Sequence, residues 1–436
     1  MKVKVIVEID DREGGVIQKT VFGSALELEE QVEEVKQRLG RIVLEYGLDE
    51  VDRSTRRPVC CGRKMNNRGR RPITVTSLSG EVPVERTRYR CQECGRESTP
   101  GDEAICCGSH RVTKALAKRV CQLATLEHYT RLEQLLADQH GVHLGHEEMA
   151  QIVHEVGGAA DRERREDADA WRQCPPEQRV WPEAEVTPQR IYVSCDGIMY
   201  CTNQVEPDPQ NPGTNRLIWQ QMRVGCVYWQ DSREQWHKRV LWGRESPQEF
   251  GVALYRLACR CGYRQAQERI FAADGGDWCW DIHHRYFSDA TGILDWFHVS
   301  EHVWATAHVL HPEADAAKAW STEALTVMRS GGGVGLVKWL LRQRPSLRCT
   351  KRRSVEQLLG YLQPRTWQME YPRYRTAGWQ IGTGMIESTA KQLVALRLKG
   401  PGMHWTEHGA VAVTALRAHN LNGNWHSFWN SLNLAT

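Results

Sequence analysis

Two apolar runs that carry acidic side chains constrain this chain more than any other feature. The first, Arg269–Ala273, ends at Asp274, which two glycines follow. This is how a buried strand delivers a carboxylate to a site that the backbone must approach closely. The second run, Ile293–Val299, contains Asp295 and His298. Leaving such polar groups buried and unpaired costs roughly 1–3 kcal/mol each, so their presence needs a structural or chemical reason.

The segments around these runs predict an α/β fold. Strands are expected at 191–201, 217–229, 239–242 and 269–273, with a helix at 247–263 after the third strand. Three adjacent strands, a helix and a fourth strand are typical of the front half of an RNase H-like layer. Residues 297–378 have a mostly helical pattern with a glycine-rich break at 331–335, and a helix that carries Glu387 follows. We therefore expect an RNase H-like domain that a helical insertion interrupts.

Three acids in this part of the chain suggest a metal site. Asp196 lies in the first expected strand, Asp274 ends the fourth, and Glu387 lies on the later helix. Two aspartates and a glutamate can hold two Mg²⁺ or Mn²⁺ ions, because hard divalent cations prefer oxygen ligands. Each residue also has a simpler interpretation. The aspartates could form turns, with Asp277 a rival for Asp274, and Glu387 could favour its helix N-terminus. Asp295 and His298 could be a satisfied polar pair inside a packed helix.

The cysteines predict a second metal site. The chain has 15 cysteines, an odd number, and six of them fall between residues 60 and 107, which favours a reduced compartment and a metal site over a disulfide framework. Two strands that turn near Ser79 separate the pairs, so residues 56–110 resemble a zinc ribbon. The four expected ligands are Cys60, Cys61, Cys91 and Cys94. Pro58 stands where a regular first knuckle has its leading cysteine. Cys106, Cys107 or His110 could therefore complete the ligand set, or the hairpin could have lost its metal.

Residues 111–175 predict helices at 114–126, 129–140 and 145–156, joined by short connections. A helix, a short glycine-containing turn and another helix favour a DNA-binding helix-turn-helix, although a plain helical hairpin has the same pattern. Basic residues are concentrated at 53–90 and 342–353, where they could contact phosphates or form an ordinary solvated face. No run of 18 apolar residues and no signal-peptide core occur, so we expect a cytoplasmic protein without a membrane span.

These expectations give a domain scheme. It comprises an N-terminal strand and helix (1–55), a zinc-ribbon-like hairpin (56–110), a helix-turn-helix region (111–175), the first catalytic part (186–296), a helical insertion (297–380), and the second catalytic part with a C-terminal tail (381–436).

Two blocks of sequence, Asp295–Trp304 and Gly382–Trp405, give the chain a family resemblance. Together with the Asp196-Gly and Ala-Asp274-Gly segments, they resemble DDE transposases of the bacterial Kra-four insertion-sequence group, which is related to the Mutator-like transposases. The likeness extends from about Val59 to the C-terminus. The substituted first cysteine knuckle departs from the family pattern.

The resemblance implies a DNA transposase that cleaves the ends of an insertion sequence and transfers the strands to target DNA. By resemblance Asp196, Asp274 and Glu387 are the catalytic metal ligands, and Asp295 and His298 match a supporting signature. Candidate contacts to the double-stranded DNA end are Arg397, Lys399, His404 and Trp405, with Trp405 or Trp304 stacking on an unpaired base. Two ends must be paired, so a homo-oligomer, at least a dimer, is expected at the bacterial nucleoid. The alternatives are a domesticated DNA-binding regulator and an RNase H-like nuclease.

Overall fold

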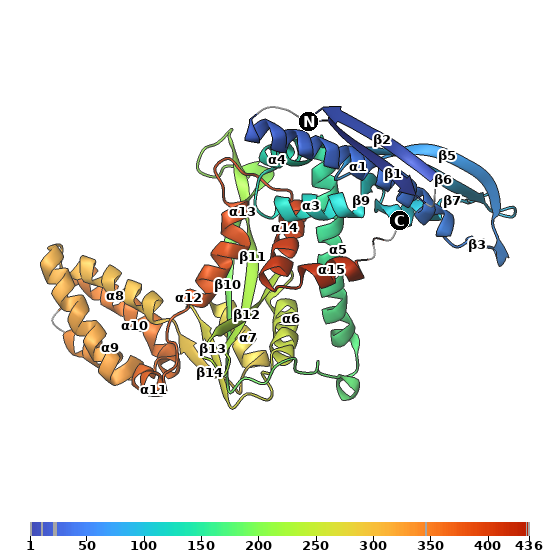
Figure 1. Ribbon diagram of the computed structural model, residues 1–436. Helices are drawn as coiled ribbons and strands as arrows, with labels where there is room; N and C mark the ends of the chain where they lie inside the picture. Colours follow the sequence, from blue (N-terminus) through green and yellow to red (C-terminus); the bar gives the residue numbers. More distant parts are fainter. Residues whose placement is uncertain (1, 10–11, 21–23, 345–346, 433, 435–436) are drawn as a thin grey trace. The chain divides into compact units, whose positions relative to one another are not determined.

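The computed structural model describes residues 2–9, 12–20, 24–344, 347–432 and 434 (Figure 1). The chain forms two compact units. Unit 1 comprises Met1–Asp161, His408–Leu416 and Trp425–Thr436, and unit 2 comprises Arg162–Glu407 and Arg417–Asn424. Each unit contains helices and strands, which confirms the predicted α/β class. Within the described ranges, no helix is long and apolar enough to cross a membrane.

A long antiparallel hairpin is the main β element of unit 1. Its strands β5 (Asn66–Ser77) and β6 (Gly80–Arg90) turn where the sequence predicts. Short strands extend the hairpin to the order β7-β6-β5-β9-β8, namely β7 (Glu97–Ser98), β8 (Cys106–Cys107) and β9 (His110–Thr113). Alternate residues of the hairpin, including Val75, Val82 and Val84, are buried in an apolar cluster. Two further antiparallel pairs are β1 (Lys2–Ile9) with β2 (Arg12–Thr20), and β3 (Val59–Cys60) with β4 (Arg63–Lys64).

The helix α1 (Ala25–Ser54) packs against this hairpin. It begins at Ser24, whose side chain forms a reciprocal capping box with Glu27. Towards its C-terminal end, Leu44 and Leu48 lie against the apolar cluster of the hairpin. Burial of this face therefore stabilises the helix beyond its intrinsic propensity.

The three helices predicted after residue 111 are present. They are α3 (Lys114–Ala124), α4 (Tyr129–His140) and α5 (His146–Gln173), and the short α2 (Pro100–Ile105) precedes them. α4 ends at Gly141, whose positive φ of 59° suits a residue without a Cβ. α5 is much longer than the predicted 145–156 segment; its charged second half is also helical.

A five-stranded sheet is the core of unit 2. Its strands are β10 (Arg190–Pro207), β11 (Asn215–Gln230), β12 (Trp236–Gly243), β13 (Glu268–Ala273) and β14 (Thr291–Leu294). Their order is β12-β11-β10-β13-β14; the first three strands are antiparallel, whereas β10, β13 and β14 are parallel. The helix α6 (Pro247–Arg260) joins β12 to β13, as predicted. The run Ile293–Val299 is divided between the end of β14 and the start of a helix.

Helices occupy most of the chain after β13. They are α7 (Asp277–Tyr286), α8 (Trp296–Leu310), α9 (Ala314–Gln343), α10 (Cys349–Leu362), a 3-10 helix (Gln363–Gln368), α11 (Tyr371–Thr376), α12 (Gly384–Ala390), a π turn (Lys391–Ala395), α13 (Leu396–Leu398), α14 (Glu407–Leu421) and α15 (Trp425–Ser431). The helices α8 to α11 separate β14 from α12, and α9 contacts α8, α10 and α11. The predicted glycine break is a kink in α9 at Gly332, whose φ is 62°.

The attachment of α1 to the hairpin gives a first prediction. Asp52, 1% exposed, accepts hydrogen bonds from the Thr87 backbone N–H at 3.0 Å and hydroxyl at 2.6 Å. We expect Asp52→Ala to lower the free energy of unfolding by about 1–3 kcal/mol, because both donors lose a buried acceptor. Urea unfolding followed by circular dichroism measures this loss. Glu50→Ala, on the exposed face of the same helix, is the matched control, and equal midpoints for the two variants would contradict the assignment.

Candidate functional site

The parallel register of unit 2 brings three acidic residues to the same end of its sheet. The last residue pairs of the two parallel ladders are Ser194–Ala272 and Ala273–Leu294. Two residues beyond the first pair, Asp196 is aligned with Asp274. One residue beyond the second pair, Asp274 is aligned with Asp295. Carboxyl ends of neighbouring parallel strands are where α/β proteins collect functional side chains.

These acids line one pocket of about 520 Å³ in unit 2. The residues that the sequence selected for catalysis and support all contribute to its wall, namely Asp196, Asp274, Glu387, Asp295 and His298. Glu387 reaches the pocket from α12 and His298 from α8. Segments nearly 200 residues apart in the sequence thus meet at one site, although their catalytic role remains a prediction.

Asp196 has the most perturbed carboxyl group of the pocket. Burial, together with the charges of Asp274 and Glu387, raises its pKa from the usual 3.8 to about 6, whereas His298 acts in the opposite direction. The Gly197 backbone N–H donates to Asp196 Oδ1 at 2.6 Å and partly offsets the effect. Like charges collected in a partly buried pocket favour either protonation or a bound cation.

Asp274 is held by the turn that follows β13. The Gly276 N–H donates to its Oδ1 at 2.9 Å, and the Trp280 indole N–H donates to its backbone carbonyl at 2.7 Å. A Cβ at Gly275 would lie only 2.5 Å from the hydroxyl of Tyr361. Only glycine fits this position without displacing the tyrosine, which explains the first of the two glycines.

Asp295 connects the start of α8 to the turn before α12. Its carboxylate accepts the Phe297 N–H at 3.0 Å, so it is the N-cap of α8. The Thr383 hydroxyl lies 2.8 Å from Asp295 Oδ2 and 2.8 Å from Glu387 Oε1. One hydroxyl proton serves only one of these oxygens at a time, and burial raises the pKa of Asp295. The backbone N–H groups of Phe297 and Thr383 donate to Asp295 whichever oxygen accepts that proton.

The donor set of the pocket fits hard divalent cations, which prefer carboxylate oxygens. Within the part of the chain that the structure describes, the only group whose ligand atoms all lie within 4.8 Å is a set of cysteines, so the carboxylates are more widely spaced.

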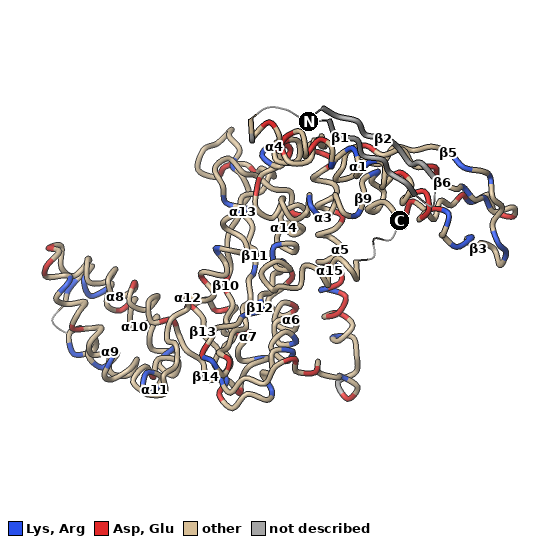
Figure 2. The backbone as a smooth tube through the Cα atoms, in the orientation of Figure 1, with Lys and Arg blue, Asp and Glu red and all other residues tan. Residues whose placement is uncertain are grey.

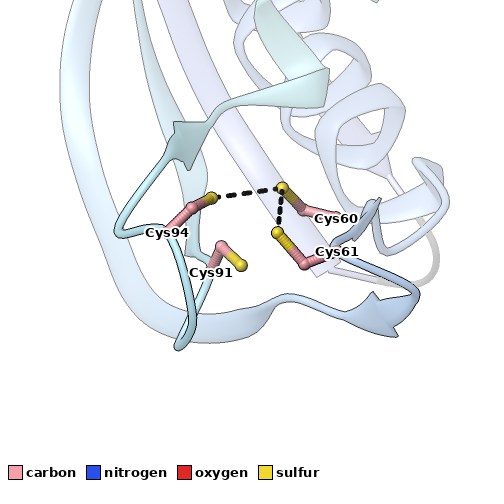
Figure 3. A group of neighbouring side chains, drawn as sticks. All are labelled: Cys60, Cys61, Cys91 and Cys94. Atoms are coloured by element: carbon pink, nitrogen blue, oxygen red, sulfur yellow. Dashed lines mark hydrogen bonds between the residues drawn. The ribbon is translucent and has the colours of Figure 1, made fainter.

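The four predicted cysteine ligands form the compact group in unit 1 (Figure 3). Cys60 ends β3, Cys61 begins the next turn, and Cys91 and Cys94 follow β6. The Cys60 Sγ lies 3.5 Å from that of Cys94 and 3.9 Å from that of Cys61. Tetrahedral zinc with bonds of about 2.3 Å separates its sulfurs by about 3.8 Å, so the geometry fits zinc.

The backbone favours a thiolate in this group. N–H groups of Cys94 and Glu93 lower the pKa of Cys91 to about 7. Cys61 has a positive φ of 51°, a conformation that costs a non-glycine residue about 1 kcal/mol or more and that the surrounding turn must hold. The adjacent Cys60 and Cys61 therefore both place a sulfur in the group, although Pro58 stands where a regular first knuckle has a cysteine.

The other residues considered as ligands lie elsewhere. Cys106 and Cys107 are buried, which raises their pKa to about 11 and about 12, and His110 is 2.9 Å from Glu155. None of the three belongs to the compact group of cysteines.

The candidate DNA contacts near the C-terminus divide into two kinds. Arg397 is 2% exposed and lies 4.7 Å above the ring of Trp405, which is itself buried and donates to the Leu398 carbonyl at 3.2 Å. Lys399 and His404 are exposed. In this structure the buried pair fixes the loop, and the exposed pair presents polar groups to solvent.

Thr383 and Phe297 are among the pocket residues that the sequence analysis did not select. Thr383 is the N-cap residue of α12, a position that a threonine before a helix could have suggested. Phe297 lines the pocket and is 63% exposed. In the sequence it is an apolar residue within an apolar run, so it gave no sign of a role at a polar site.

Comparisons with known proteins give three findings. Residues 22–175 match the model of a family described as an uncharacterised protein family, UPF0236, and this match ends before the acidic pocket. No curated protein matches the chain. Among solved structures, the chain is similar to the Drosophila P element transposase strand transfer complex, with 8% identity, 70% of this chain and 79% of that chain covered, and a TM-score of 0.24. A TM-score this low does not establish a shared fold.

The cysteine geometry predicts about one equivalent of zinc in the purified protein. We expect Cys91→Ser and Cys94→Ser to lower that content severalfold, because tetrahedral zinc needs four ligands. Elemental analysis by mass spectrometry measures it. Cys349→Ser, an exposed cysteine outside the group, is the control. Less than half an equivalent in the unaltered protein, or full zinc in both variants, would rule out this site.

The raised pKa of Asp196 predicts a pH-dependent effect on stability. Below about pH 4 the group is protonated in both the folded and the unfolded chain, so it does not lower the free energy of unfolding. At higher pH the unfolded chain releases the proton first, and the free energy of unfolding falls as the pH rises through about 6. We expect Asp196→Asn to stabilise the protein at pH 7.5, by up to about 3 kcal/mol, and the advantage to vanish near pH 4. Melting temperatures without added divalent cation measure this. The exposed Asp281→Asn is the control, and a destabilised Asp196→Asn at pH 7.5 would refute the interpretation.

Proposed function

We propose that this protein is a DNA transposase of the DDE type, which binds the ends of an insertion sequence and catalyses strand cleavage and strand transfer. The observation that carries the proposal is the pocket in which Asp196, Asp274 and Glu387 meet. Asp196 lies in β10, level with Asp274 at the end of the parallel strand β13, and Glu387 lies on a helix that follows a long helical segment. This arrangement supports an RNase H-like catalytic domain with a helical insertion.

The proposed chemistry is in-line displacement at phosphorus. Water attacks the phosphodiester at an element end and breaks its P–O3′ bond, which frees a 3′-hydroxyl. This hydroxyl then attacks a target phosphodiester and displaces the 3′-oxygen of the target strand. Two Mg²⁺ or Mn²⁺ ions, when bound, would supply charge neutralisation and activation of the attacking oxygen. The protein would supply position: Asp196, Asp274 and Glu387 hold the cations, and Thr383 orients Glu387 through its 2.8 Å hydrogen bond.

Asp295 and His298 have supporting roles in this proposal. Asp295 forms hydrogen bonds with the start of α8 and with the turn that contains Thr383, so it holds these two segments of the pocket together. His298 lines the pocket and, when protonated, offsets the negative charge around Asp196. Neither residue needs to form a covalent intermediate.

Recognition of double-stranded DNA is assigned mainly to unit 1. The helices α3, α4 and α5 supply a candidate helix-turn-helix, and the cysteine group, with zinc bound, would stiffen the base of the hairpin. Lys and Arg are frequent along β4 and β5 (close to the labels β3 and β5 in Figure 2), where Arg63, Lys64, Arg68 and Arg71 are exposed. Such side chains contact phosphates without reading sequence.

Further DNA contacts are proposed in unit 2. Exposed basic residues at the start of α10, Lys351, Arg352 and Arg353, belong to the second basic run. Lys399 and His404 could contact the DNA end, while Arg397 and Trp405 hold their loop. Pairing of two ends would require at least a homodimer, and membership of the Kra-four group and a bacterial nucleoid location are part of the same proposal.

A cleavage and joining assay tests the function. Labelled DNA from both flanks of the coding sequence is incubated with Mg²⁺ and either the unaltered protein, Asp196→Asn or Glu387→Gln. We expect cleavage and joining to fall by at least 100-fold in both variants with DNA binding retained, since cation positioning contributes several kcal/mol to such reactions. Asp281→Asn, an exposed acid on α7, should behave like the unaltered protein.

The other outcomes distinguish the alternatives. Cleavage without joining would indicate a nuclease rather than a transposase. DNA binding without cleavage by any of the proteins would indicate a regulator. Equal cleavage by the unaltered protein and Asp196→Asn would remove the catalytic assignment.

A further inference from the structure

The hydroxyl of Tyr361 is a polar group whose position needs an explanation. Tyr361 lies near the end of α10, within the helical segment that separates β14 from α12. Its hydroxyl oxygen is buried and, among the described residues, no hydrogen-bond partner contacts it. A buried donor without an acceptor costs about 1–3 kcal/mol, so such groups usually have a role or a partner that arrives later.

This hydroxyl lies beside the turn that carries Asp274. The position of a Cβ on Gly275, the next residue after Asp274, is 2.5 Å from the Tyr361 oxygen. Burial, together with the nearby charges of Asp274 and Asp295, raises the pKa of Tyr361 to about 12. The phenol is therefore protonated at neutral pH and can donate a hydrogen bond.

The ring of Tyr361 is fixed between two side chains. The His302 ring of α8 lies 4.1 Å from it, centre to centre, and the Arg365 guanidinium lies 4.7 Å above its ring centroid. The same arginine donates to the Gly275 carbonyl at 3.1 Å and to Asp277 at 2.9 Å. Residues of the helical segment thus hold the turn after β13 from outside the pocket.

Asp274 has a second carboxylate oxygen that could accept a hydrogen bond from the Tyr361 hydroxyl. Its Oδ1 already accepts the Gly276 N–H at 2.9 Å, which anchors one side of the carboxylate. Its neighbours Gly275 and Gly276 have no side chains that could shield the other side.

We propose that Tyr361 is a positioning residue for Asp274. When the Asp274 carboxylate turns to hold a divalent cation, it accepts a hydrogen bond from the Tyr361 hydroxyl. The inference rests on the proposed function, because it assigns Asp274 to cation binding. It gives the helical segment a part in the chemistry: α10 supplies the outer partner of a ligand that β13 delivers. Outer partners of this kind orient metal ligands and raise their affinity for the ion.

Binding of Mn²⁺ tests the inference without any assay of activity. The zinc-loaded full chain is titrated with Mn²⁺ and followed by electron paramagnetic resonance of the free ion, for the unaltered protein, Tyr361→Phe and Asp274→Asn. We expect Tyr361→Phe to weaken Mn²⁺ binding about 10-fold and Asp274→Asn to weaken it more. The control is Tyr286→Phe, which removes a hydroxyl that donates to the Gln248 carbonyl at 3.0 Å, outside the pocket, and should leave binding unchanged.

Melting temperatures of the same proteins separate positioning from a structural role. Without cation, Tyr361→Phe should melt at or above the temperature of the unaltered protein, because it loses only an unsatisfied donor. Unchanged Mn²⁺ affinity in Tyr361→Phe with weakened binding in Asp274→Asn would overturn the inference and leave the proposed function standing. Unchanged affinity in both variants would remove the proposed function as well. A Tyr361→Phe protein that melts several degrees lower would show a structural hydroxyl and also overturn the inference.

Discussion

The parallel pairing of β10, β13 and β14 is the constraint on which the candidate site depends. Asp274 and Asp295 directly follow the ends of β13 and β14, and Asp196 lies within β10, two residues past the end of its parallel ladder with β13. The register therefore places the three carboxylates side by side. A shift of one residue in either ladder would turn one carboxylate to the opposite face of the sheet, because side chains alternate along a strand. Burial of the apolar face of each strand opposes such a shift.

The same register creates an electrostatic problem. Carboxylates that are collected in a partly buried pocket repel one another, and the pKa of Asp196, raised to about 6, reflects this. The structure offsets the repulsion with short local donors, the N–H groups of Gly197 and Gly276 and the hydroxyl of Thr383. These donors hold the oxygens in place but do not neutralise their charge. A site of this kind gains most when divalent cations enter it.

The sequence predicted Asp196 and Asp274 because apolar strand segments flank or precede them, and Glu387 because it lies on a predicted helix. Asp274 follows a buried run, and Asp196 interrupts a long strand. The cysteine group was predicted from the pairs at 60–61 and 91–94, but spacing could not decide between its four residues and Cys106, Cys107 or His110. The fold decided it, since His110 is 2.9 Å from Glu155 and the buried cysteines face the interior.

Features that arise only from tertiary contact were beyond the sequence. The pattern of α12 does not reveal that Thr383 meets both Asp295 and Glu387. The approach of Tyr361 to Gly275 depends on how α10 packs against α8, and no spacing encodes that. Arg397 and Trp405 are residue types that often contact DNA. In the fold they bury each other, because the backbone of Trp405 pairs with Thr202 of β10. Local composition describes chemistry, whereas exposure depends on the partners that the fold supplies.

Diffraction from a crystal of the protein with Mn²⁺ and DNA would test the central claim most directly. Anomalous scattering locates Mn²⁺ without assumptions about the ligands. The account predicts two peaks about 3.5–4 Å apart, in contact with the carboxylates of Asp196, Asp274 and Glu387 and beside a phosphate. A well-ordered pocket without Mn²⁺, or Mn²⁺ bound to a set of residues that excludes these three, would contradict it.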